Sequence, residues 1–138
     1  MTIMFHDQID RRAQAFRDVI RDYAELPRPH NTEVRREGET GVRMHFLHLD
    51  DVIAWALHFG TPLQLKPTSM FVRASTTILV EDVFMLIWTQ LDPIEAWALL
   101  VKAGYDATDR EFEESFKVHG VEIPASHAFA ISTLASAG

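Results

Sequence analysis

The chain has 138 residues with no cysteine, 47% hydrophobic and 24% charged residues, and a formal net charge of −7. The lack of cysteine excludes disulfides, thiolate metal sites and cysteine nucleophiles. The excess negative charge lies in residues 81–138, where ten acidic residues outnumber three basic ones, and an acidic surface disfavours direct nucleic-acid binding.

Segment 7–26 has the apolar spacing of an amphipathic helix. Apolar residues recur there at intervals of three and four positions and so share one helical face: Ile9, Ala13, Phe16 and Ile20. Pro27 and Pro29 are expected to end this helix, because a proline ring lacks an N–H donor and restricts the preceding residue.

Residues 31–48 are expected to form a β-hairpin around the sequence EGETG, with a short helix after it. Apolar and polar side chains alternate from Val42 to His48, as in a strand with one face in water. Asp50 is expected to be the N-cap of the next helix, which is apolar on nearly all sides and ends at Gly60.

The segment 70–91 contains two strongly apolar runs that are separated by Glu81 and Asp82. The runs are rich in β-branched and aromatic residues, and two acidic residues suit a tight turn, so a central hairpin is predicted. Leu63 to Leu65, which lies between two prolines, is expected to be a short edge strand because proline cannot donate to a central ladder.

Three further helical patterns follow the hairpin. Asp92 and Pro93 predict a helix start, and the expected buried face of that helix consists of Ile94, Trp97, Ala98, Leu100 and Val101. Thr108 and Glu111 match a capping box for segment 109–118, although a strand would also place Phe112 and Phe116 on one face. Segment 125–137 has a weaker helical pattern.

These elements predict one α+β domain that spans residues 1–138. Its antiparallel sheet would have the central hairpin at about 70–91, packed against the N-terminal amphipathic helix and two or three further helices. A cytoplasmic protein without membrane association is expected, because the N-terminus lacks a secretory signal pattern and no apolar run reaches the ~18 residues that a membrane span requires.

The sequence contains none of the motifs that mark a nucleophile elbow, a phosphate loop or a dinucleotide site. His45 and His48 would point to opposite faces of a strand, which argues against shared metal binding with the nearby His58. We therefore expect no catalytic residue, no metal and no cofactor. The alternative is a small-molecule binder or cofactor-free enzyme, with a pocket between the sheet and the first helix that is lined by Tyr23, His45 and Asp50.

Three Trp, nine Phe and two Tyr could exceed what one small core can bury, although a single large core could also hold them. The leading hypothesis is a noncatalytic protein that binds a second copy of itself or another protein, such as an accessory or inhibitory factor of a mobile element. A further hypothesis is an acidic inhibitor of a nucleic-acid-binding enzyme, whose partner-binding face would carry four acidic residues: Asp109, Glu111, Glu113 and Glu114.

Overall fold

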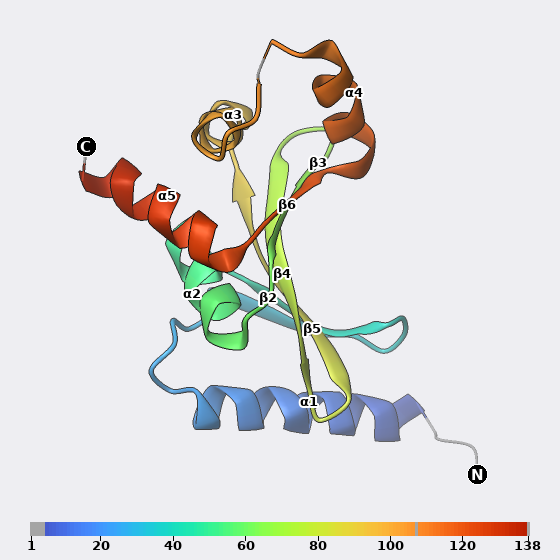
Figure 1. Ribbon diagram of the computed structural model, residues 1–138. Helices are drawn as coiled ribbons and strands as arrows, with labels where there is room; N and C mark the ends of the chain where they lie inside the picture. Colours follow the sequence, from blue (N-terminus) through green and yellow to red (C-terminus); the bar gives the residue numbers. More distant parts are fainter. Residues whose placement is uncertain (1–4, 107, 138) are drawn as a thin grey trace.

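A computed structural model describes residues 5–106 and 108–137 of the chain (Figure 1). Within these residues the elements follow in the order α1 (Phe5–Asp22), β1 (Asn31–Val34), β2 (Thr40–His45), α2 (Leu49–Phe59), β3 (Leu63–Pro67), β4 (Val72–Val80), β5 (Val83–Leu91), α3 (Pro93–Lys102), α4 (Arg110–His119), β6 (Val121–Ile123) and α5 (Ala125–Ala137). The six strands form one sheet in the order β1-β2-β5-β4-β3-β6. The predicted α+β class is confirmed.

The sheet is mixed, so the expectation of an antiparallel sheet was wrong for one pair of neighbouring strands. β2 runs parallel to β5, with Arg43 opposite Leu86 and His45 opposite Trp88, whereas the other neighbouring strands are antiparallel. A helix and two strands lie between β2 and β5 in the chain, and local alternation contains no information about a partner so far away. The described residues also contain five helices, one at each of the five helical patterns of the sequence, whereas the first helix and two or three others were expected to pack against the sheet.

The central strands β4 and β5 pair antiparallel from Val72 opposite Leu91 to Val80 opposite Val83. Glu81 and Asp82 connect them, with φ angles of 51° and 63°. Positive φ at both positions is the geometry of a two-residue type I′ connection, which matches the twist of the flanking strands. Neither residue is a glycine, so the connection holds two side chains in a backbone region that disfavours them.

One face of the sheet forms the core with α2, which lies on that side together with α5 (Figure 1). Side chains of alternate strand positions point into this core and are fully buried, among them Met44, Ile78 and Ile87. Trp55 of α2 is also fully buried, and its indole N–H donates to the backbone oxygen of Pro27 over 2.9 Å. This bond ties α2 to the segment that leaves α1.

Helix α1 crosses the end of the sheet beneath the β4–β5 connection (Figure 1). Val19 is fully buried in the shared core, and Arg12 donates to the backbone oxygens of Arg35 and Gly38 over 2.6 and 2.7 Å. Gly41 of β2 permits this close approach, because an added Cβ would lie 3.0 Å from the Arg12 side chain and 2.7 Å from the Val83 side chain. The first helix therefore contacts the β1–β2 loop as well as the core.

Two expectations about strands require correction. β3 is not at an edge, because it pairs with β4 on one side and with β6 on the other. Pro67 is the last residue of β3 and Pro62 precedes the strand, so neither proline interrupts the pairing in its middle. The partner strand β6 has only three residues, Val121–Ile123, and was not predicted.

The helix ends also differ in part from expectation. The N-cap of α2 is His48, which makes no side-chain capping bond, and Asp50 lies in the first turn. Asp92 does cap α3, and its Oδ1 accepts from the Ile94 N–H over 2.7 Å. Segment 109–118 is helical in α4, but its cap is Asp109, while Thr108 donates to Asp106 instead. Among the described residues no helix is long and apolar enough to cross a membrane.

Candidate functional site

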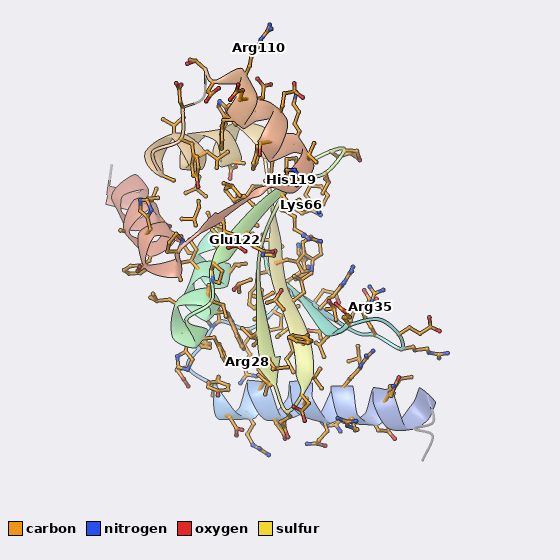
Figure 2. All side chains as sticks on the ribbon, turned by 45° about the vertical axis from the view of Figure 1, so that its right-hand side comes forward. Arg28, Arg35, Lys66, Arg110, His119 and Glu122 are labelled. Atoms are coloured by element: carbon orange, nitrogen blue, oxygen red, sulfur yellow. The ribbon has the colours of Figure 1, made fainter. Side chains whose placement is uncertain are left out.

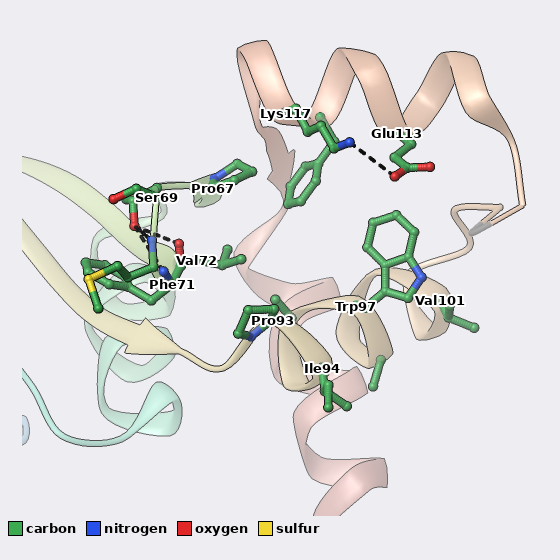
Figure 3. A pocket seen from close by; sticks show the side chains of 15 residues that line it. Pro67, Ser69, Phe71, Val72, Pro93, Ile94, Trp97, Val101, Glu113 and Lys117 are labelled. Carbon is green, nitrogen blue, oxygen red and sulfur yellow. Dashed lines mark hydrogen bonds and ion pairs between the residues drawn. The ribbon is translucent and has the colours of Figure 1, made fainter.

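An apolar groove of about 1000 Å³ lies between the β3–β4 loop, α3 and α4 (Figure 3). Its lining is largely hydrophobic, with Pro67, Met70, Pro93, Ile94, Trp97 and Phe116 among the contributing side chains. Volumes of this size are at the upper end of the range found for small-molecule pockets. The groove is therefore large enough to take several side chains of a partner.

Helix α3 forms one wall of the groove and has apolar residues on more than one side. Ala96, Leu99 and Leu100 are buried against the domain, whereas Ile94 is 80% exposed and Val101 is 51% exposed. Ala98 is exposed as well, so the expectation that Ile94, Ala98 and Val101 belong to the buried face was wrong. Because α3 is apolar nearly all round, only one of its faces can meet the domain core, and the other is left against the groove.

The β3–β4 loop forms the opposite rim and is held by its own hydrogen bonds. The Thr68 N–H donates to the Phe71 backbone oxygen over 2.7 Å, and the Phe71 N–H donates to the Thr68 hydroxyl over 3.1 Å. This turn leaves Met70 84% exposed at the rim. A flexible thioether side chain in that position can adapt to apolar groups of different shapes.

Aromatic packing supports the floor of the groove. The Trp97 ring lies 6.2 Å from Phe112 and 6.1 Å from Phe116, measured between ring centroids, and Phe112 stacks on Tyr105 at 4.8 Å. Phe116 is only 5% exposed. These interlocked rings fix α3 and α4 relative to each other, so we expect the groove to be largely preformed.

Charged residues surround this apolar surface unevenly. Glu113 and Lys117 both line the groove and form an i,i+4 ion pair at 3.3 Å (Figure 3). Segment 92–119 carries seven acidic and three basic residues, which gives a formal charge of −4. The segment that forms α3 and α4 is thus acidic overall, whereas the two charged residues of the groove lining have opposite signs.

Known protein families, characterised proteins and solved structures give no match to this chain. The site must therefore be interpreted from its own chemistry. It offers apolar contact area and shape next to an acidic segment of the chain, and the described residues that line the groove include no nucleophile or general base grouped with a reactive partner.

The four acidic residues predicted for partner binding occupy different positions on or beside α4. Glu113 lines the groove, and Asp109 caps the helix by accepting the Glu111 N–H over 3.0 Å. Glu111 and Glu114 are exposed, and neither is part of the groove lining. Sequence reasoning missed Ile94 and Val101 as surface residues, although the all-round apolar character of α3 contains the signal. It also missed Met70, which lies in the β3–β4 loop outside any periodic pattern.

The residues of the alternative small-molecule site do not share one cavity. His45 lies beside Trp88 on the sheet face that points away from the core, with ring centroids 4.5 Å apart. Asp50 accepts a hydrogen bond from Ser132 and lines a separate hollow of about 450 Å³ that also includes His58. Tyr23 packs edge-on against His58 at 5.2 Å.

The surroundings of His45 determine the protonation of its ring. Burial, and to a lesser degree the neighbouring His30, lowers the pKa of His45 below its ordinary value of 6.5, so the ring is neutral at pH 7. Among the described residues no group of three or more His, Asp or Glu side chains is placed to bind a metal ion.

Proposed function

We propose that the protein is a noncatalytic binding protein that holds an apolar segment of another protein in the groove between the β3–β4 loop, α3 and α4. The observation that carries this proposal is the uncovered apolar face of α3, where Ile94 and Val101 are exposed beside Met70. Exposed apolar side chains that gather around a preformed groove are typical of protein contact sites.

The expected occupant is a short amphipathic segment with two or three large apolar side chains flanked by Lys or Arg. Burial of one such side chain is worth roughly 1.5–3 kcal/mol, so a few of them can offset the entropy of association and give a complex of about micromolar affinity. Basic flanking residues would complement the charge of −4 on segment 92–119.

A different protein is a better occupant than a second copy of this chain. In a symmetric homodimer the same surface meets itself, so the acidic segments of both subunits would be brought together. Like charges across an interface disfavour association. The charge pattern therefore favours a heteromeric contact, in which this protein acts as an accessory factor.

The test uses labelled 16-residue helical peptides and fluorescence anisotropy. One peptide combines a Leu stripe with Lys, the second combines the same stripe with Glu, and the third is a scrambled version of the first. The Ile94→Glu variant introduces a charge into the groove. Val118→Glu is the matched control, because Val118 is 64% exposed on α4 and does not line the groove.

We expect saturable binding of the basic amphipathic peptide alone. Ile94→Glu should weaken it by at least about tenfold, since a buried apolar contact is lost and a carboxylate must be desolvated. Val118→Glu should leave it within about twofold. Equal binding of the acidic peptide, equal loss in both variants, or no saturation of the basic peptide at about 1 mM would reject the proposal.

A further inference from the structure

The sheet face that points away from the core is not covered by any described helix (Figures 1 and 2). Two arginines lie on this face, Arg43 from β2 and Arg73 from β4. Successive side chains of a strand point to opposite faces of the sheet, and the neighbours Met44 and Ala74 are fully buried on the core face. The chain has a net charge of −7, so a gathering of cations at this position is unexpected from composition.

A polar hollow of about 470 Å³ opens beside Arg73, at the junction of β3, β4 and β6. Lys66 lies directly across the β3–β4 ladder from Arg73, and both side chains line the hollow together with His119 at the end of α4. Figure 2 shows Lys66 and His119 on this side of the molecule, above Glu122. Three nitrogen donors from three elements therefore surround one space.

The backbone brings these donors together at Gly120. This residue has a φ of +70°, and a Cβ added there would lie 2.4 Å from the backbone oxygen of Leu65. Only glycine allows α4 to end so close to β3. The position of His119 relative to Lys66 is thus fixed by a backbone contact rather than by side-chain packing.

The arginines of this face lack the partners that usually stabilise them. The Nε–H groups of Arg43 and Arg73 are buried and donate to no acceptor among the described residues. The nearby carboxylates are paired with other groups. Glu122, which lines the same hollow, accepts from Gln64 over 3.0 Å, and Glu33, directly across from Arg43, pairs with Arg35 at 3.6 Å. Burial, followed by the charge of Arg43, lowers the pKa of Arg73.

An aromatic surface lies on the same sheet face, on the β5 side of Arg73. Trp88 lies across the ladder from Ser75, which is two positions beyond Arg73 on β4 and leaves room because its side chain is small. Phe71 stacks with Trp88 at 6.5 Å between ring centroids, and His45 contacts Trp88 from the other side. Planar groups of a ligand can stack on such a surface.

We propose that the hollow beside Arg73 binds the oxyanion of a small aromatic molecule, a phosphate or a carboxylate, which is held by Arg73, Lys66 and His119 while its ring lies toward Trp88. A guanidinium and an ammonium that face the same space provide the donors that either oxyanion requires. The ligand supplies the acceptors that Arg73 lacks within the chain. The hollow shares no lining residue with the apolar groove, and this proposal does not depend on the function proposed for the groove.

The test is a titration of the ¹⁵N-labelled protein followed by NMR. The probes are adenosine monophosphate, indole-3-acetate, inorganic phosphate and adenosine, which separate the phosphate, the carboxylate, the bare anion and the uncharged ring. Arg73→Gln removes one cation from the hollow. Arg110→Gln is the control with the same charge change, because Arg110 is exposed at the far end of α4 (Figure 2).

We expect saturable shifts of the Lys66, Arg73 and Gly120 amide signals with adenosine monophosphate or indole-3-acetate, weaker binding of inorganic phosphate and none of adenosine. Whichever of these two aromatic anions binds more tightly shows whether the hollow prefers a phosphate or a carboxylate. Arg73→Gln should weaken its binding about tenfold or more, and Arg110→Gln should leave it unchanged. The melting temperature of free Arg73→Gln should not fall, since an unpartnered guanidinium is removed.

Four results would overturn the proposal. The first is the absence of saturable shifts with both aromatic anions, and the second is equally weakened anion binding in Arg73→Gln and Arg110→Gln. The third is a lower melting temperature of Arg73→Gln with unchanged anion binding, which would make Arg73 purely structural. The fourth is binding of a ten-residue oligothymidylate more than about a hundredfold tighter than the mononucleotide, which would indicate a nucleic-acid strand as the ligand.

Discussion

The hydrogen bond from Trp55 to Pro27 offers a sharp test of how α1 and α2 are held together. The Trp55 side chain is fully buried, its N–H donates to the Pro27 oxygen over 2.9 Å, and its ring stacks on Phe59 with centroids 5.9 Å apart. The substitution Trp55→Phe keeps an aromatic ring in the core and removes the donor together with part of the ring volume.

Two losses add up in this variant. The missing bond costs about 1 kcal/mol, and somewhat more if water does not reach the Pro27 oxygen. The smaller ring removes apolar atoms worth about 0.8 kcal/mol per methylene-sized group and leaves a cavity, which adds about 1–2 kcal/mol. We therefore expect Trp55→Phe to lower the free energy of unfolding by roughly 2–4 kcal/mol, a large part of the stability of a typical domain.

Urea denaturation at 25 °C, followed by far-ultraviolet circular dichroism, measures this change. Trp97→Phe is the matched control, because the Trp97 ring lines the solvent-open groove, and it should cost less than about 1 kcal/mol. A loss below about 1 kcal/mol in Trp55→Phe, or equal losses in both variants, would refute the reasoning. An altered denaturant slope would point instead to a changed unfolded state.

Three further changes test the turns. Asp82→Gly should raise the free energy of unfolding by roughly 0.5 kcal/mol in chemical denaturation. The substitution removes the steric strain of a φ of 63°, and the backbone entropy of glycine offsets part of that gain. A lower free energy of unfolding would contradict the type I′ assignment. A hydrogen bond with Asp18 raises the pKa of Glu81 above its ordinary 4.5, while hydrogen bonds from Gln14 and then from Glu81 lower the pKa of Asp18. The stabilisation from Glu81 is therefore present below pH 4.5 and is lost as the pH rises through the raised value. Glu81→Gln should therefore gain melting temperature relative to the natural protein between pH 4 and pH 7, and a constant or opposite difference would count against this pair. Gly120→Ala should lower the free energy of unfolding, measured by thermal denaturation, by about 2 kcal/mol or more, because the added Cβ would collide with the Leu65 backbone oxygen. An unchanged melting temperature would show that the backbone relaxes at this position.

Local sequence patterns predicted the elements that depend on local chemistry. The amphipathic spacing before Pro27 and the capping pair of Asp92 and Pro93 both correspond to helices in the structure. Patterns failed where the outcome depends on distant segments. The parallel pairing of β2 with β5 and the inner position of β3 follow from which strands meet in space, and a three-residue strand such as β6 has too few positions to show alternation.

The candidate sites were less predictable than the fold. The apolar residues of α3 were recognised, but the choice of the face that meets the core depends on where α4 and the β3–β4 loop lie, so Ile94 was assigned to the wrong environment. Likewise, Lys66, Arg73 and His119 come from three separate elements, and no spacing in the sequence relates them. The acidity of segment 109–114 predicted a partner-binding face, but it contained no information about the groove or about the ion pair of Glu113 with Lys117.

The parallel seam between β2 and β5 has a consequence for how this chain can be made and divided. During synthesis the first hairpin emerges well before β5. Its contacts with α1 can form early, but its parallel pairing cannot form until residue 91 has left the ribosome. Contacts of such long sequence separation slow folding. Fragments that stop before β5 should consequently be unable to assemble the N-terminal half, so the chain must be expressed and studied whole.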